Sequence, residues 1–379
     1  MKDIAVAGVG IHPFGRFERG YRELGAHAAT EALADAGINY SDVDITLVGN
    51  VGAEMAKGQN VMDGVGRTGR PIINVESACA SSGSALYLGA SLIEGGAASI
   101  VLCLGLEKAP RGFVAASGFQ EWQIKTGLGV NPLYFALAAQ ELIETTDTTL
   151  DDLADVSVKN HAHAIDNPNA MYRKAVTREE VLASRMVCPP LTLLMLCAPN
   201  EGAAGVVLMS KAEAARRGIN GAPRLRSVSL VSRGPRDWFV PSASFPAENR
   251  PSLTARAAEE AYSAAGIEPS DIDVVECQDT DAASELLAYR DLGLCEPGGE
   301  AHLLRSGATR LGGRIPVNPS GGLLSKGEPL GASGLGQVHE LVQQLRGRSR
   351  TRQVEGAQVA VGHVMGAGHV ASVVVLTAN

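Results

Sequence analysis

The stretch that decides the fold is Ala26-His-Ala-Ala-Thr-Glu-Ala-Leu-Ala-Asp-Ala-Gly-Ile-Asn-Tyr-Ser-Asp-Val-Asp44, because it occurs twice. The second copy is Ala255-Arg-Ala-Ala-Glu-Glu-Ala-Tyr-Ser-Ala-Ala-Gly-Ile-Glu-Pro-Ser-Asp-Ile-Asp273, and more than half of the positions are identical. Each copy predicts a helix that ends at a glycine C-cap, Gly37 or Gly266, before a Ser-Asp turn and an apolar strand. Two Ala-rich helices can resemble each other by chance, but the shared cap, turn and strand favour a duplication.

The repeat predicts two halves of like topology, residues 1–225 and residues 226–379. In the first half, the apolar patterns predict strands at 4–9, 45–48, 72–75 and 99–105 and helices at 26–36 and 81–94. In the second half they predict strands at 226–231, 273–276, 315–317, 358–363 and 372–377 and helices at 254–264 and 332–344. Strands that alternate with helices are typical of an α/β fold.

A long region at about 108–200 separates the regular elements of the two halves. Its sequence predicts helices at 130–144, 150–163 and 178–184, joined by Pro-rich turns. Insertions of this kind often form a lid or a substrate loop.

The overall composition is that of a globular protein with a sizeable core, since 45% of the 379 residues are hydrophobic and 20% are charged. The net charge of −8 comes without a basic, aromatic-rich patch, so we expect no nucleic-acid partner. Six scattered cysteines without a Cys-x-x-Cys pair predict neither a disulfide framework nor a zinc site. The chain shows neither a signal peptide nor a membrane-spanning apolar run, and we therefore expect a cytoplasmic protein.

The candidate nucleophile lies in the segment Asn74-Val-Glu-Ser-Ala-Cys79-Ala-Ser-Ser-Gly-Ser-Ala-Leu86. A turn from strand to helix here brings the Cys79 sulfur to a helix N-terminus, where unpaired N–H groups and the helix dipole favour a thiolate. The small residues that follow leave room for a substrate. This pattern predicts a covalent nucleophile, and the alternative is a small buried core cysteine.

The duplicated pattern and several motifs together resemble the thiolase superfamily across essentially the whole chain. The motifs are Glu76-Ser-Ala-Cys79-Ala-Ser-Ser-Gly, Lys159-Asn-His-Ala-His163 followed by Asn167-Pro, Ala198-Pro-Asn-Glu-Gly-Ala-Ala204, Val274-Val-Glu276 with Glu285-Leu-Leu, Asn318-Pro-Ser-Gly-Gly-Leu-Leu-Ser-Lys-Gly327, and Pro329-Leu-Gly-Ala-Ser-Gly334. Within the superfamily, the chain looks most like the sterol-carrier-protein and lipid-transfer branch. The resemblance implies a duplicated, five-layered αβαβα fold, a dimeric core, coenzyme A as a substrate, and no metal in this chain.

Three catalytic motifs of that branch are altered here. Gly327-Glu328-Pro329 stands where the branch has Gly-His-Pro, and Gln278-Asp279-Thr280-Asp281 stands where it has His-Asp-Cys-Phe. The C-terminal loop reads Val364-Met365-Gly366 instead of Cys-x-Gly.

The resemblance implies a role for each position that matches. Cys79 is the nucleophile, Gln278 an oxyanion donor, and the backbone N–H groups of Cys79 and Gly366 form an oxyanion hole. Glu328 takes the place of the histidine that activates the thiol. It can act as a base if burial raises its pKa, whereas a fixed charge beside Cys79 would oppose thiolate formation and leave a scaffold subunit.

The second acid/base of the site is open at this stage, because Thr280 has replaced a thiol. Asp279, Asp281 and His363 are candidates, although His363 in a strand points to the face opposite its neighbours. His161 and His163 can line the pocket or lie in solvated loops. The remaining cysteines are predicted to be core residues, with Cys277 able to reach the site only if the local register slips.

These assignments predict an acyl-CoA enzyme that cleaves or forms a C–C bond of an unusual, branched or aromatic 3-ketoacyl-CoA through an acyl-Cys79 intermediate. Three alternatives stay open: a retro-aldolase acting on a 3-hydroxyacyl-CoA, an acyltransferase that forms an ester or amide, and a non-catalytic subunit. The resemblance also implies a separate zinc-ribbon/OB-fold partner chain, because thiolase-like subunits of this branch pair with one.

Overall fold

The computed structural model describes residues 4–52, 54–112, 119–235, 237–240, 243–245 and 250–379. The strands are β1 (Ile4–Gly15), β2 (Ile45–Asn50), β3 (Ile72–Val75), β4 (Ile100–Lys108), β5 (Met186–Cys188), β6 (Leu191–Thr192), β7 (Glu201–Ser210), β8 (Arg224–Val228), β9 (Val231–Ser232), β10 (Trp238–Val240), β11 (Ala243–Phe245), β12 (Val274–Glu276), β13 (Val359–Gly366) and β14 (Val370–Thr377). The α-helices are α1 (Tyr21–Ala36), α2 (Lys57–Met62), α3 (Ser81–Glu94), α4 (Glu121–Lys125), α5 (Asn131–Thr145), α6 (Leu150–Ala164), α7 (Arg178–Ala183), α8 (Lys211–Arg216), α9 (Leu253–Ala265), α10 (Ala282–Asp291), α11 (Glu300–Arg305), α12 (Gly322–Lys326) and α13 (Ser333–Leu345). The 3₁₀-helices are η1 (Tyr40–Asp42), η2 (Leu193–Met195), η3 (Pro269–Asp271), η4 (Leu330–Ala332) and η5 (Arg350–Arg352).

Among the described residues, ten strands drawn from both halves join in one hydrogen-bonded sheet, while β5–β6 and β10–β11 form two separate two-stranded sheets. The path through the larger sheet is β12-β13-β14-β8-β1-β7-β4-β2-β3, with β9 paired to β14. The two halves meet where β1 pairs with β8, over only two residue pairs. Pairing is parallel between β2 and its neighbours β3 and β4 and between β12 and β13, so the strands at the two ends of the path have crossover connections.

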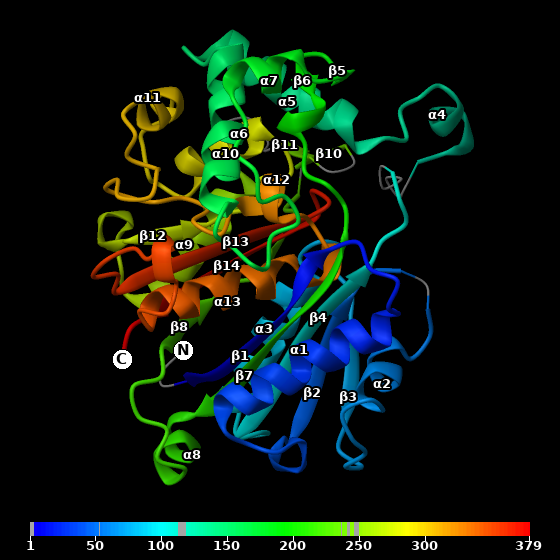
Figure 1. Ribbon diagram of the computed structural model, residues 1–379, viewed down its shortest axis with the longest axis vertical. Coiled ribbons are helices and arrows are strands. Elements are labelled where there is room, and N and C mark those ends of the chain that lie inside the picture. The colour runs from blue at the N-terminus through cyan, green and yellow to red at the C-terminus, as the bar shows by residue number, and fades with distance from the viewer. Residues whose placement is uncertain (1–3, 53, 113–118, 236, 241–242, 246–249) are drawn as a thin grey trace.

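The helices form layers around these strands. Helices α3 and α13 contact each other and lie between the two sets of strands, as Figure 1 shows. A buried apolar cluster joins both helices to strands of both halves, through residues such as Leu86, Val206, Leu341 and Val374. Helix α1 covers the outer face of the first half and α9 that of the second. This αβαβα layering confirms the expected fold class.

The two copies of the repeat form the same local structure. Helices α1 and α9 both end at a left-handed glycine, Gly37 with φ +66° and Gly266 with φ +69°. After each turn an aspartate accepts hydrogen bonds from the start of a neighbouring strand. Asp44 Oδ2 binds the N–H groups of residues 99 and 100 at 2.8 and 3.0 Å, and Asp273 Oδ2 binds those of residues 358 and 359 at 2.7 and 2.9 Å. The repeated Asp is therefore the residue that fixes the strand register in each half.

Two features of the sheet differ from the prediction. Strand β7 was missed, although it lies between β1 and β4 and is buried along almost its whole length. The apolar run Gly202-Ala-Ala-Gly-Val-Val-Leu-Met209 was the available signal. The strand predicted at 315–317 forms only an isolated bridge, Val317 to Val275. Pro316 has no N–H group to donate, so the ladder cannot extend there.

The inserted region folds largely into helices that pack over the second half (Figure 1). Its helices α5, α6 and α7 lie close to the predicted bounds, and α6 packs on α10 and α12. Within the described ranges, no helix combines the length and the apolar character that crossing a bilayer requires.

A buried ion pair connects the inserted region to the second half. Lys159 Nζ lies 2.9 Å from Glu285 Oε1, and both side chains are 0% exposed. Asn160 and Asn318 each donate to Glu285 Oε2 at 2.7 Å. Because such a pair is surrounded by protein, the removal of Lys159 leaves the buried Glu285 carboxylate without its counter-ion.

We therefore expect Lys159→Met to lower the free energy of unfolding by about 3–5 kcal/mol, the usual loss when one partner of a buried pair is removed. Urea unfolding followed by circular dichroism measures this loss. The control is Arg67→Met, which breaks the exposed Arg67–Asp63 pair and should leave the unfolding curve unchanged. Equal unfolding midpoints for Lys159→Met and the parent protein would contradict the prediction.

Candidate active site

The turn that carries Cys79 lies between β3 and α3. Strand β3 ends at Val75, and Cys79 directly precedes Ala80, the N-cap residue of α3. Ala78 adopts a left-handed conformation with φ +49°, which is unfavourable for a residue with a side chain. The Ser81 hydroxyl holds this turn closed, since it accepts from Ser77 N at 2.9 Å and donates to Ala78 O at 2.6 Å.

Glu328 is positioned by backbone hydrogen bonds to the segment that precedes β7. Its N–H donates to Ala198 O at 3.1 Å, and Asn200 N donates to Glu328 O at 3.1 Å. Gly327 before it has φ +101°, and a Cβ there would lie 1.7 Å from Asn200 Nδ2. Only glycine fits this approach, which brings Glu328 into the protein at 3% exposure.

Three donors converge on the Glu328 carboxylate. Cys79 hydrogen-bonds it, which places the predicted nucleophile against the predicted base. Cys197 Sγ donates to Oε2 at 2.9 Å, and Gln278 Nε2 donates to Oε1 at 3.3 Å. The carboxylate is thus a shared acceptor for two thiols and an amide.

Electrostatics keep Cys79 in its thiol form. Burial, the negative charge of Glu328 and the hydrogen bond to it raise the pKa of Cys79 well above its ordinary value. The expectation that the helix N-terminus would favour a thiolate is therefore wrong, because burial and the adjacent carboxylate have the larger effects. Burial also raises the pKa of Glu328, while its hydrogen bonds to Cys197, Cys79 and Gln278 lower it. The resting site is therefore a thiol beside a carboxyl group whose pKa burial raises.

Gln278 and Gly366 lie beside this pair. The Gln278 carbonyl accepts from Met365 N, so its amide NH₂ is turned toward Glu328. A Cβ on Gly366 would lie 2.1 Å from Ser77 O and 3.2 Å from Ala80 Cβ, so Gly366 packs directly on the turn that carries Cys79. The structure thus brings together Cys79, Glu328, Gln278 and Gly366.

His363 lies on the other face of its strand, as period-2 alternation predicts. Its Nε2 is 3.0 Å from Thr254 Oγ1 of α9, and burial lowers its pKa to about 4. Helix α9 covers the outer face, so His363 is turned away from Cys79.

The other acid/base candidates are engaged in structural roles. Asp281 caps α10 and accepts from Ala283 N at 2.9 Å and Ser284 N at 3.1 Å. Asp279 accepts from Leu323 N at 2.6 Å at the start of α12. His163 bonds Asn318 O at 2.9 Å, and His161 bonds Lys174 O at 3.1 Å.

Cys197 is the residue of this cluster that sequence reasoning missed. It was assigned to the core with Cys188, because both flank an apolar loop. The available signal was its position directly before the Ala198–Ala204 motif. Cys277, by contrast, is buried, and its N–H donates to Asn318 Oδ1 at 2.9 Å.

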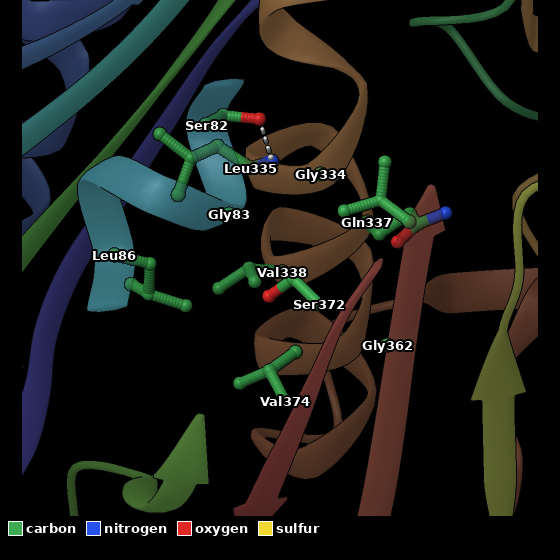
Figure 2. Close-up of a pocket in the computed structure, with 11 residues that line it drawn as sticks. Ser82, Gly83, Leu86, Gly334, Leu335, Gln337, Val338, Gly362, Ser372 and Val374 are labelled. Carbon is green, nitrogen blue, oxygen red and sulfur yellow. Dashed lines mark hydrogen bonds between the residues drawn. The ribbon is translucent and has the colours of Figure 1, made fainter. Parts of the chain in front are cut away.

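A separate small cavity lies between the halves, where α3 and α13 approach β13 and β14 (Figure 2). Its volume is about 10 Å³. Ser82 Oγ in its wall accepts from Leu335 N at 3.2 Å, the contact drawn as a dashed line. Such a volume suits about one water molecule and is far below the several hundred Å³ of a ligand pocket. This cavity is a packing feature between the two central helices.

The comparisons with known proteins identify the family. The family model of the thiolase N-terminal domain matches residues 6–212, more than half of the chain. This chain belongs to the thiolase family. The model described as thiolase C-terminal domain-like matches residues 247–379. The matches stop at residue 212 and resume at 247, so the predicted boundary at 225 stays a prediction.

Several known proteins resemble the chain over nearly its full length. It is 36% identical over 392 residues to human sterol carrier protein 2, covering 97% of this chain and 70% of that protein. It is also 36% identical over 380 residues to benzoylsuccinyl-CoA thiolase subunit BbsB of Thauera aromatica, covering 97% and 95%. A chain of the Ltp2-ChsH2(DUF35) aldolase has the same fold, with a TM-score of 0.83, 23% identity and 99% and 98% coverage. The branch inferred from the motifs is confirmed.

Proposed function

We propose that this chain is an acyl-CoA enzyme that cleaves or forms a C–C bond next to a thioester through an acyl-Cys79 intermediate. The observation that carries the proposal is the buried Glu328 carboxylate, which Cys197 Sγ at 2.9 Å and Gln278 Nε2 at 3.3 Å hold in place and whose charge raises the pKa of the Cys79 thiol. A thiol of raised pKa needs an adjacent base at the moment of attack, and Glu328 is in the position to be that base.

The proposed cleavage starts with attack of the Cys79 sulfur on the 3-keto carbon, while Glu328 takes the thiol proton. The C2–C3 bond then breaks, its electron pair passes to the departing acyl-CoA carbanion, and the proton held by Glu328 is transferred to that carbanion, which completes the product and restores the carboxylate. Attack by the thiol of a second coenzyme A on the Cys79 thioester releases the shortened acyl-CoA and returns a proton to Cys79. Oxyanion donors proposed for these steps are the Gln278 amide and the backbone N–H groups of Cys79 and Gly366.

The partner chain is part of the proposal. We propose a homodimeric core that pairs with a separate zinc-ribbon/OB-fold protein in the cytoplasm. The support is the similarity to two proteins whose names indicate assemblies, a thiolase subunit and an aldolase with a DUF35 component.

A retro-aldolase is the second candidate, favoured by the fold that the chain shares with the Ltp2-ChsH2(DUF35) aldolase. In that reaction a base removes the proton of a 3-hydroxyl group, the C2–C3 bond breaks, and no acyl group is transferred to Cys79. Glu328 is the base available for either chemistry, so acylation of Cys79 is what separates the two candidates.

The test exposes the protein to a panel of linear, branched and aromatic acyl-CoA thioesters and measures its mass. We expect a mass gain equal to the acyl group, located on the peptide that contains Cys79 and removed by added coenzyme A. Protein first alkylated with iodoacetamide is the control and should gain nothing further. If products of C2–C3 cleavage form while Cys79 stays unacylated, that result would instead support the retro-aldolase.

A further inference from the structure

Cys197 contributes a second thiol to the Glu328 carboxylate. Cys197 Sγ lies 2.9 Å from Glu328 Oε2, and Cys197 is partly exposed. Cys79 binds the same carboxylate, so the base of the site accepts from the nucleophile and from a thiol that is not the nucleophile. We propose that Cys197 is a positioning residue, which holds Glu328 in the orientation and the ionised form that accept the Cys79 proton. This inference rests on the proposed role of Glu328 as the base.

Backbone contacts fix where Cys197 lies. Its N–H donates to Thr280 O at 2.9 Å, and Leu196 forms a bridge to Asp281. On its other side, Glu328 N donates to Ala198 O at 3.1 Å. The loop therefore lies between the segment of residues 280–281 and the Glu328 loop. Since none of these contacts uses the thiol, substitutions of the Cys197 side chain should leave the backbone in place.

The surrounding charges keep Cys197 a hydrogen-bond donor. Within the described part of the chain, the titratable groups that act on Glu328 are the two thiols, and burial and the charge of Glu328 raise the pKa of both. The negative charges of two further carboxylates also raise these pKa values, Glu107 that of Cys79 and Asp279 that of Cys197. Cys197 therefore stays protonated and donates to Oε2.

A donor to a carboxylate stabilises its ionised form. Burial has the opposite effect on Glu328, so each of its donors extends the pH range in which it can act as a base. Removal of the Cys197 donor should raise the pKa of Glu328, and reactivity that depends on ionised Glu328 should then begin at higher pH.

The experiment follows alkylation of Cys79 by iodoacetamide from pH 5 to pH 9, with initial rates read from the Cys79 peptide by mass spectrometry. In this reaction the sulfur–carbon bond forms, iodide leaves, and the thiol proton passes to Glu328. In the parent protein we expect the alkylation rate to rise with pH as Glu328 ionises, and we call this part of the profile the rising limb. For Cys197→Ala we expect the midpoint of the rising limb to lie about half a pH unit to one unit higher, the effect of losing one hydrogen bond to a charged group. Below both midpoints the rate should therefore fall about three- to tenfold.

Two variants control this result. Cys197→Ser restores a donor and should return the midpoint to that of the parent protein or below it. Cys188→Ala, which removes another partly exposed cysteine near the same loop, should leave the midpoint unchanged. An unshifted Cys197→Ala midpoint, or a Cys197→Ser midpoint displaced as far as that of alanine, would overturn the inference.

Glu328→Gln separates this inference from the proposed function. If Glu328→Gln retains the pH profile of the parent, Glu328 is not the base and the proposed mechanism fails. If Glu328→Gln loses the rising limb while Cys197→Ala does not shift it, only the role of Cys197 is overturned. A shift that persists when Cys197→Ala is combined with Glu328→Gln would show that Cys197 acts on Cys79 directly, and that result also overturns the positioning role.

Discussion

Cys79→Ala is expected to abolish acylation and to lower turnover on the order of 10⁶-fold, the size of loss seen when other covalent enzymes lose their nucleophile. The physical reason is that alanine removes the sulfur that forms the thioester in the proposed mechanism, while it leaves the turn intact. Ser77, Ala78 and Ser81 hold that turn through their backbone and hydroxyl groups, and none of those contacts uses the Cys79 side chain. Steady-state turnover and the intact mass after exposure to acyl-CoA are the measurements.

The matched control for this variant is Cys103→Ala. Cys103 is a buried cysteine in β4. Its Sγ contacts Ala85 O at 3.4 Å rather than the Glu328 carboxylate. It should retain acylation on Cys79 and most of the turnover. Turnover of Cys79→Ala within tenfold of the parent would refute the covalent mechanism and shift the weight to the retro-aldolase.

Glu328→Gln is expected to slow single-turnover acylation of Cys79 by about 10²–10⁴-fold, the usual contribution of general acid–base catalysis. Glutamine keeps the size of the side chain and can still accept from Cys197, but it cannot take the Cys79 proton. Burial raises the pKa of Glu328, and a base works only when it is ionised. The parent rate should therefore rise with pH through this raised pKa and then level off, and the glutamine variant should lack that rise.

Two further forms complete the comparison. Glu328→His restores a side chain that can accept a proton, so it should acylate faster than Glu328→Gln if the role is proton transfer. Glu355→Gln, at an exposed turn before β13, is the control for loss of one negative charge and should acylate like the parent. Equal acylation rates for Glu328→Gln and the parent would mean that another group activates Cys79.

Much of the site was predictable from the sequence, because the relevant patterns are local. Cys79 was recognisable from the small residues around it and the helix that follows, which the structure places at Ser81–Glu94 as predicted. Glu328 was recognisable through the family resemblance, because Gly327-Glu328-Pro329 stands where the branch has Gly-His-Pro. Even the direction of His363 followed from strand alternation. Strand β7 was missed because its run begins with Gly and Ala residues, which are depleted in strands.

The sequence by itself determined the duplication, the α/β class and the thiolase family, and it identified the Cys79 thiol and the Glu328 carboxylate as candidate catalytic groups. Caps, turns and periodicity act over a few residues, so one sequence is sufficient to show them. Only the tertiary structure decided that Cys197, 131 positions away in the chain, donates to Glu328. It also decided the protonation state of Cys79, because burial and a neighbouring carboxylate outweigh the helix N-terminus. Both depend on which segments pack together, and desolvation and charge act through space rather than along the chain.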